Sequence, residues 1–236
     1  PYGGNNAADN SGVMTYVSIC YAGARSTQDI EHNGLTLNGV GNGTTIENIY
    51  VLESADDAIE FFGGTVNVKN LLAVNSDDDM FDFTQGYCGT LSNCYGIWES
   101  DYTSTEADPR GIEADGNFDG LYPNHLRQSD FVVDGMTIVN NAANTTDNVD
   151  RMQDVIKIRR GAKATIKNAL VKGTGGAIDL VDMNDGKGAG NAASTISITN
   201  SLQLTGKKLN GEAVLNEAGS NTGADTSVFG WTKYNF

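Results

Sequence analysis

Carboxylates dominate the side chains that could carry out chemistry in this sequence. Residues 54–61 read SADDAIEF and residues 76–83 read SDDDMFDF, so an aspartate cluster beside an alternating apolar segment recurs after 22 residues. If these segments stack, each close like-charge pair costs on the order of 4 kcal/mol at an effective dielectric constant of about 20. Such an array is stable when it is solvated, partly protonated or neutralised by a cation. Calcium suits it, because calcium accepts about six to eight oxygen ligands in a flexible geometry. The predicted ligands are Asp56, Asp57, Asp77, Asp78 and Asp79. A solvated acidic corner is the alternative.

A second set of oxygen ligands lies at Asp115-Gly-Asn-Phe-Asp-Gly120, which matches the first half of a calcium-binding loop. The ligands there would be Asp115, Asn117 and Asp119. The twelfth position is Leu126 rather than a bidentate glutamate, so the segment is not an EF-hand. A shortened calcium loop on a β scaffold and a plain turn both remain open.

The sequence contains few residues that could support histidine-based or nucleophilic catalysis. Only two histidines are present, His32 and His125, and His125 lies beside no candidate nucleophile. No catalytic residue is predicted. The enzymatic alternative is a polysaccharide lyase or glycoside hydrolase that combines paired carboxylates with the basic segment KIRRGAKATIK at 157–167. That segment is equally typical of an outer strand that balances an acidic neighbour.

Three aromatic residues near predicted loops are candidates for carbohydrate binding. An aromatic side chain offers a large apolar face and a polar edge, which suits a sugar ring. The candidates are Trp98, Tyr102 and Tyr122, with a role as loop anchors as the alternative.

Composition excludes several classes of function. The 236 residues include 30 acidic and 15 basic side chains, and the formal charge of −15 argues against nucleic acid and anionic membranes as partners. No run of about 20 apolar residues predicts a membrane span. The three cysteines do not have the spacing of a zinc site, and a disulfide between Cys88 and Cys94 stays open.

The elements that must position these groups follow from an internal repeat. Apolar positions coincide when IENIYVL (46–52) is set over VKNLLAV (68–74) and LSNCYGI (91–97), and further copies begin at residues 14, 133, 166 and 198. Short apolar–polar–apolar segments such as Ile59-Glu-Phe and Phe81-Asp-Phe supply a second strand. Two or three short strands in about 22 residues predict one coil of a parallel β-helix.

One column of the repeat is rich in asparagine. Stacked coils lie about 4.8 Å apart, so an inward amide in one coil can donate to the amide oxygen of the next coil. The predicted structural ladder consists of Asn48, Asn70, Asn93, Asn168 and Asn200.

Several long stretches resemble a known group of proteins. These stretches are YGGNNAADNSGVMTYVSICYAG (2–23), the region 33–83 and RGIEADGN (110–117). They are similar to secreted or surface β-helix proteins and lipoproteins of Bacteroidota. Members of that group are largely uncharacterised, and some carry type IX secretion signals. The resemblance implies an exported, right-handed parallel β-helix and brings no catalytic residues. It also implies that relatives have further coils ahead of this chain.

Together these observations predict a single all-β domain over residues 1–236, a right-handed parallel β-helix (solenoid) of about seven coils. The expected function is that of a non-enzymatic extracellular or cell-surface protein in adhesion, glycan binding or envelope assembly, stiffened by calcium. The expected partners are a polysaccharide or another surface protein, with association through the N-terminal end of the helix and no membrane insertion.

Overall fold

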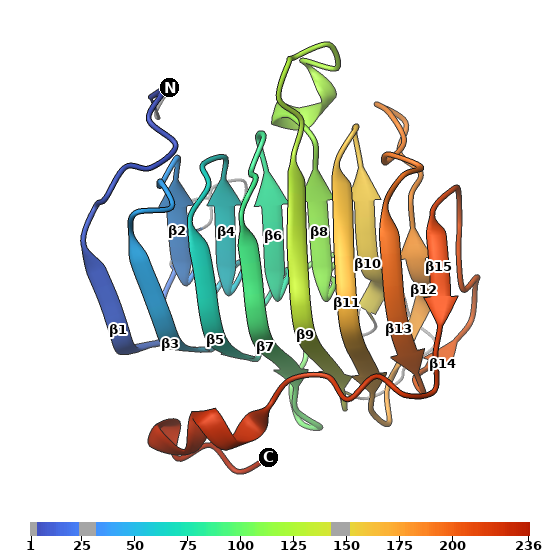
Figure 1. The fold of residues 1–236 in the computed structure, drawn as a ribbon. Coiled ribbons are helices and arrows are strands. Elements are labelled where there is room, and N and C mark those ends of the chain that lie inside the picture. Colours follow the sequence, from blue (N-terminus) through green and yellow to red (C-terminus); the bar gives the residue numbers. More distant parts are fainter. Residues whose placement is uncertain (1–3, 24–31, 143–151) are drawn as a thin grey trace.

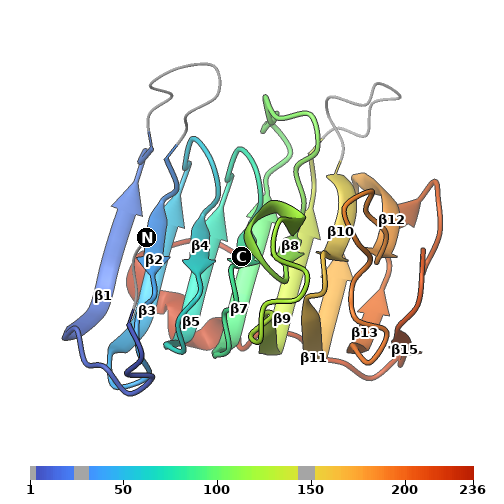
Figure 2. The same cartoon turned by 90° about the horizontal axis from the view of Figure 1, so that it is seen from above.

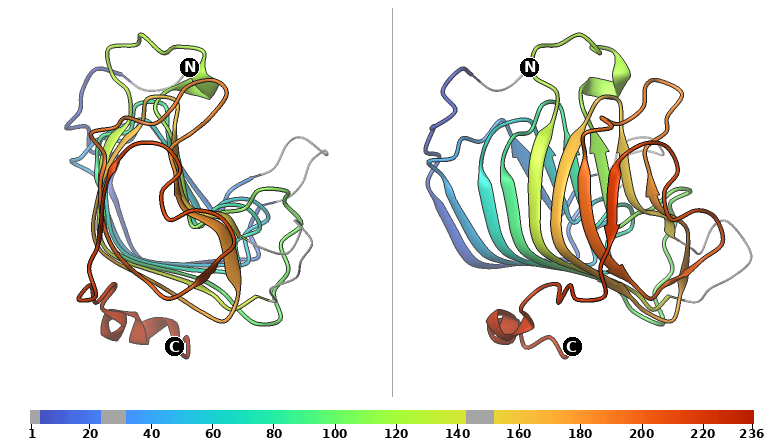
Figure 3. Two further views of the ribbon diagram at one scale, coloured as in Figure 1. Left: turned by 90° about the vertical axis from the view of Figure 1, so that its right-hand side faces the viewer. Right: turned by 45° about the vertical axis from the view of Figure 1, so that its right-hand side comes forward.

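The computed structural model describes residues 4–23, 32–142 and 152–236. The backbone winds into a parallel β-helix whose successive coils place strands in two parallel sheets (Figure 1). Seen from above, the strands of each sheet lie side by side along the helix axis (Figure 2), and the end-on view shows the coils superposed around a common interior (Figure 3). The predicted all-β solenoid is confirmed.

The strands of the eight-stranded sheet are, in spatial order, β1 (Val13–Cys20), β3 (Thr45–Leu52), β5 (Asn67–Val74), β7 (Thr90–Trp98), β9 (Asp130–Asn140), β11 (Lys163–Lys172), β13 (Thr195–Asn200) and β15 (Val214–Glu217). The strands of the seven-stranded sheet are β2 (Leu35–Asn38), β4 (Ile59–Phe62), β6 (Phe81–Thr84), β8 (Ile112–Asp115), β10 (Met152–Arg159), β12 (Gly176–Asp182) and β14 (Gln203–Leu204). Two short 3-10 helices, η1 (Phe118–Gly120) and η2 (Thr226–Thr232), lie outside the coils.

The coils stack in the register that the repeat predicts over most of their length. Ile46 pairs with Val68, Val68 with Leu91, and Leu91 with Val133. The prediction is wrong for the last copy, because Ile166 pairs with Ile196 rather than with Ile198. The register shifts there by one residue, since β13 has no counterpart to the bend that interrupts β11.

The bend occurs at the residues of the predicted asparagine column. Four of the five predicted asparagines have the backbone conformation of this bend. Asn48, Asn70, Asn93 and Asn168 have φ values of 57°, 58°, 53° and 50°. Left-handed backbone favours asparagine and glycine over other residues, which explains the composition of the column. The amide of Asn70 donates to Asn48 Oδ1 and the amide of Asn93 to Asn70 Oδ1, each at 2.9 Å.

Two parts of the ladder prediction are wrong. Asn200 pairs with Val171 rather than with Asn168, and within the described residues its side-chain amide bonds to the backbone of Leu202 and not to another asparagine of the column. The ladder also faces outward rather than inward, because Asn93 and Asn168 bond to the C-terminal segment that lies outside the coil.

The interior is filled by apolar and aromatic side chains. Phe61, Phe83 and Phe131 stack with ring centroids 5.1 and 4.1 Å apart, and Tyr87 lies against all three. Cys94 is buried in the same core, whereas Cys88 is half-buried in another part of the coil, and all three cysteines are free thiols. The disulfide that the sequence left open is therefore not formed.

Candidate functional site

The outer face of the seven-stranded sheet carries a line of charged side chains. Strand alternation turns Ile59, Phe61, Phe81 and Phe83 into the core, so the intervening residues face outward. Pairing between neighbouring strands then places these intervening residues in one line across the sheet. We call this line the charged file: Glu60, Asp82, Glu113, Lys157 and Asp182.

The aspartates that the sequence singled out lie beside the beginning of this file. Asp57 and Asp79 precede β4 and β6, and the backbone nitrogen of Asp79 donates to Asp57 Oδ1 at 3.0 Å, which confirms that the two corners stack. Both are almost fully buried, with 5% and 2% of their surface exposed. The carboxylates converge into three groups whose oxygens lie within 4.8 Å of one another: Asp56–Asp57–Asp78, Asp57–Glu60–Asp82 and Asp79–Asp82–Glu113.

Burial and mutual repulsion perturb these groups strongly. Burial, and then the neighbouring carboxylate of Asp82, raises the pKa of Asp57 well above its ordinary value. Burial likewise raises the pKa of Asp79 and of Asp82. Glu60, which accepts a hydrogen bond from the Asn33 amide at 2.6 Å, has its pKa raised by burial to about 7.

Several of these buried carboxylate oxygens have no hydrogen-bond partner. One oxygen of Asp79 and one of Asp82 make no bond to any group in the described part of the chain, and the same holds for one oxygen of Asp78. The positive charge of Arg110 opposes the rise in the pKa of Asp79, but its ion pairs in the described part of the chain are to Glu113, to Asp108 at 2.7 Å and to Asp154 at 3.5 Å. Unpaired, converging carboxylate oxygens are the donor set that a hard divalent cation such as calcium requires.

Asp77, the fifth predicted ligand, has a different role. Its Oδ1 accepts hydrogen bonds from the Tyr102 hydroxyl at 3.1 Å and from the Thr105 backbone at 2.7 Å. Its Oδ2 accepts from the Thr105 hydroxyl. The carboxylate of Asp77 therefore anchors the loop over residues 99–109.

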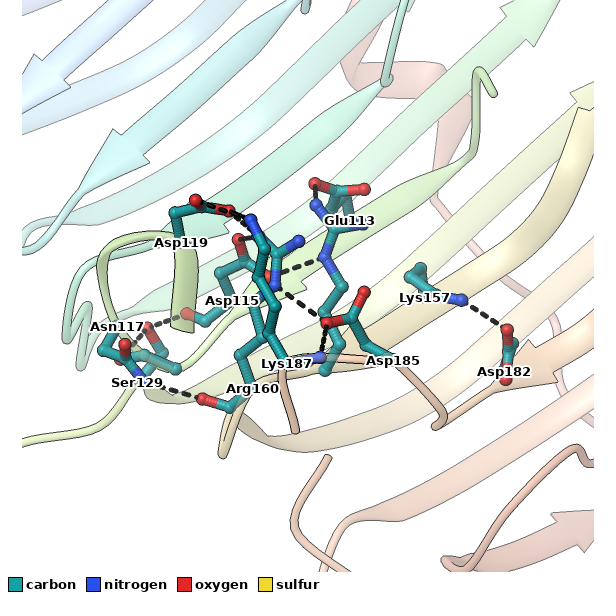
Figure 4. A network of polar contacts seen from close by, with 12 residues as sticks. Glu113, Asp115, Asn117, Asp119, Ser129, Lys157, Arg160, Asp182, Asp185 and Lys187 are labelled. Atoms are coloured by element: carbon teal, nitrogen blue, oxygen red, sulfur yellow. Dashed lines mark hydrogen bonds and ion pairs between the residues drawn. The ribbon is translucent and has the colours of Figure 1, made fainter. Parts of the chain in front are cut away.

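The predicted calcium loop at residues 115–120 is held instead by the chain's own cations (Figure 4). Asp115 contacts Arg159 Nε and Arg160 Nη1, each at 2.7 Å. Asp119 contacts Lys187 at 2.5 Å and Arg160 at 3.0 Å. The positive charge that calcium would supply is already present there.

Asn117, the third residue predicted at that loop, closes it. Its amide donates to Gln128 Oε1 and to the Arg160 carbonyl, and its Oδ1 accepts from the Tyr122 backbone at 2.9 Å. The basic segment at 157–167 thus serves the loop and its neighbouring strands, with Lys157 bound to Asp182 and Arg159 also bound to Glu113.

The three predicted carbohydrate-binding aromatics lie in different surroundings. Trp98 is 1% exposed and its indole nitrogen donates to the Ser76 carbonyl at 2.9 Å, so it is a core residue and cannot stack on a ligand. Tyr102 is half-buried and lies against Trp98, with ring centroids 6.0 Å apart. Tyr122 is 58% exposed on the loop that follows η1.

The predicted ligand set omitted Glu60, Asp82 and Glu113. The repeat contained the signal for the first two, because Glu60 and Asp82 occupy the same place in their copies. Glu113 could have been found by setting Ile112-Glu-Ala over Phe81-Asp-Phe. A further group, Asp154, Asp179 and Asp182, also has converging oxygens, and Lys157 partly neutralises it.

The fold agrees with the comparison with known families. The chain belongs to the family of pectate-lyase-like β-helix domains, whose model matches residues 1–233. Searches of curated proteins and of solved structures found no match. Within the described residues, no helix is long and apolar enough to cross a membrane.

Proposed function

We propose that this protein is an extracellular or cell-surface β-helix that binds carbohydrate and holds a calcium ion at the beginning of the charged file. Membership of a pectate-lyase-like family supports carbohydrate as the ligand. The carboxylates of Asp79, Asp82 and Glu113, whose oxygens lie within 4.8 Å of one another, would hold the ion, with Asp57 and Glu60 beside them. When bound, calcium would neutralise the face and offer open coordination positions to sugar hydroxyls or carboxylates.

The observation that carries the proposal is the set of buried, unpaired oxygens on Asp79 and Asp82. A buried acceptor without a partner costs about 1–3 kcal/mol, and more when it is charged. A solvated corner would not bury these groups. Protonation would supply one O–H donor for each carboxyl, but the cluster would then lose its stabilisation as the pH rises. A cation satisfies several of them at once.

Binding is better supported than catalysis. A lyase needs a basic group free to take a proton from the sugar, but Lys157 is bound to Asp182 and Arg159 to Glu113 and Asp115. Adjacent carboxylates of the file follow the strand spacing of about 4.8 Å, so the spacing of the file does not select one glycosidase geometry. The ion pairs on this face favour a binding protein over the enzymatic alternative.

Calcium titration of thermal unfolding tests the proposal. Each tenfold increase in calcium above its dissociation constant should add about 1.4 kcal/mol to the free energy of unfolding. For a chain of this size, that corresponds to roughly 3–5 °C in Tm per decade. Magnesium should have a smaller effect, because it requires tighter octahedral coordination.

The Asp79→Asn variant makes the test specific. This change removes one ligand and one buried charge, so the calcium shift should disappear while the Tm in EDTA stays equal or rises. Asp130→Asn is the matched control, since Asp130 is an exposed partner of Lys163. A Tm that does not respond to calcium in the unmodified protein would contradict the metal site.

A further inference from the structure

A hollow lies between the loop over residues 116–129 and the glycine-rich corners that follow β4 and β6. Its two adjoining parts have volumes of about 290 and 630 Å³, and both are lined by Gln85, His125 and Arg127. Phe118 and Tyr122 line the smaller part, and Phe62 lines the larger. In a chain with 30 acidic residues, no described carboxylate lines either part.

Arg127 differs from the arginines of the neighbouring network. Arg159 and Arg160 each contact at least two carboxylates. The guanidinium of Arg127 makes no ion pair within residues 4–23, 32–142 and 152–236, although its aliphatic stem lies against Gly86. The hollow therefore presents an unneutralised, forked cation beside exposed aromatic rings.

The loop that carries Arg127 is fixed before any ligand binds. The amide of Gln128 donates to the carbonyls of Tyr122 and His125 at 3.1 and 3.0 Å, and Asn117 bonds to Gln128. The imidazole Nδ1 of His125 lies 3.2 Å from the Arg127 backbone nitrogen, which donates to it. At the other side, Lys187 and Arg160 hold Asp119 (Figure 4). A loop ordered in advance loses little conformational entropy on binding.

We propose that this hollow is a second carbohydrate site, separate from the charged file, which takes an anionic group carried on a sugar ring. The guanidinium of Arg127 would form paired charge-assisted hydrogen bonds to a carboxylate or sulfate. The rings of Tyr122 and Phe118, which are 58% and 52% exposed, would cover the apolar face of the sugar. Without a bound cation, the acidic sheet face repels such a group, whereas a cationic hollow lined by no described carboxylate attracts it. This inference rests on the proposed function only in taking carbohydrate as the ligand.

Calorimetric titration in EDTA and low salt tests the site without any contribution from a bound divalent cation. The probes are an oligouronate, a sulfated oligosaccharide and a neutral oligosaccharide of the same length. At least one anionic probe should bind about tenfold or more tightly than the neutral one, and comparison of the two anionic probes identifies the source of the charge. Equal binding of neutral and anionic probes, or binding of none, would overturn the proposal.

Variants separate recognition from folding. Arg127→Gln should weaken binding of the anionic probe about tenfold or more, and Tyr122→Ala should weaken it while Tyr122→Phe retains it. Lys163→Gln is the matched control, because Lys163 is an exposed cation paired with Asp130 and does not line the hollow. An Arg127→Gln variant that binds as well as the unmodified protein would also overturn the proposal.

The two sites fail independently. Asp79→Asn should bind the anionic probe in EDTA as the unmodified protein does, because Asp79 lies outside the hollow. Loss of probe binding in this variant would show that the anion binds elsewhere. A missing calcium response leaves the titration in EDTA unaffected.

Discussion

Asp79 and Asp115 show how one residue type acquires different properties from its neighbours. Asp115 lies between two arginine side chains at 2.7 Å, so its negative charge is balanced within the chain. Asp79 is also buried, but its neighbours include Asp57, Asp82 and Glu113, and one of its oxygens has no hydrogen-bond partner among the residues that the structure describes. The difference lies in the neighbours and not in the aspartate: two arginines form ion pairs with Asp115, whereas Arg110 acts on Asp79 without an ion pair between them in the described residues.

The raised pKa values predict an unusual dependence of stability on pH. The pKa of Glu60 rises from 4.5 to about 7 on folding, and those of Asp57, Asp79 and Asp82 rise as well. The folded chain therefore binds protons more tightly than the unfolded chain in this range. In EDTA, the free energy of unfolding should fall as the pH rises from about 4.5 to 7, because these groups must ionise while buried.

Saturating calcium should remove that decline, because the ion stabilises the ionised carboxylates. Thermal melts across this pH range, in EDTA and in calcium, measure both slopes. Glu60→Gln should flatten the slope in EDTA, whereas Asp130→Asn should leave it unchanged. Stability that rises with pH in EDTA would show that the buried cluster is already neutralised within the chain.

At the scale of elements, the C-terminal segment spans several coils. Backbone groups of Thr222, Ala224 and Asp225 donate in turn to Asn168, Thr137 and Asn93, which lie on β11, β9 and β7. The segment then continues as η2 over β3 and β5 (Figure 1). Because it bonds to successive strands, it ties together coils that otherwise contact only their neighbours.

Phe229 is the anchor of this segment. It is fully buried in a cluster on the outer face of the eight-stranded sheet that also contains Tyr50, Leu72, Tyr95 and Ile97. Phe229→Ala should cost about 3–5 kcal/mol locally and release the segment.

Limited proteolysis and amide hydrogen exchange detect this release. The variant should be cleaved near residues 218–225 and should lose protection at β3 and β5, whereas Phe118→Ala, at an exposed ring, should not. Unchanged protection in Phe229→Ala would show that the hydrogen bonds to Asn93 and Asn168 hold the segment alone.

At the scale of the whole molecule, β1 presents an exposed apolar edge. Val13 and Tyr16 on this strand are 74% and 65% exposed, although the Tyr16 ring also contacts Trp231. β1 pairs with β3 alone in the described part of the chain. Exposed strand edges pair readily with other chains. The 236-residue chain should therefore associate through this end.

Light scattering during size-exclusion chromatography measures the association. Val13→Lys should shift the chain toward the monomer, because a charged edge resists pairing. Val214→Lys, at the exposed valine of β15, should have no effect. A monomer at high concentration in the unmodified chain would contradict the predicted association.

The repeat predicted the fold well, because a coil that stacks on copies of itself must repeat its buried positions. The apolar positions Ile46, Val68, Leu91 and Val133 form the predicted line, and the stacked corners of Asp57 and Asp79 follow from the same spacing. The prediction failed at Asn200, where the bend is missing from β13 and the register shifts.

The candidate site was less predictable, because loops of different lengths separate its members. Asp115 and Arg160 are 45 residues apart in the sequence, and they are neighbours because β8 and β10 lie in adjacent coils. No local pattern showed that Arg159 and Arg160 would neutralise one acidic group and leave another unpaired. Trp98 was likewise predicted to be an exposed aromatic near a loop, although it is a core residue whose indole nitrogen donates to the Ser76 carbonyl.

The sequence alone determined that like side chains would lie above one another, since a short, regular period leaves the backbone few other ways to bury its apolar positions. It could not determine which carboxylates would meet a cation of the chain itself. That depended on how insertions of unequal length bring distant coils together, because Coulomb interactions depend on distance in space and not on separation along the chain.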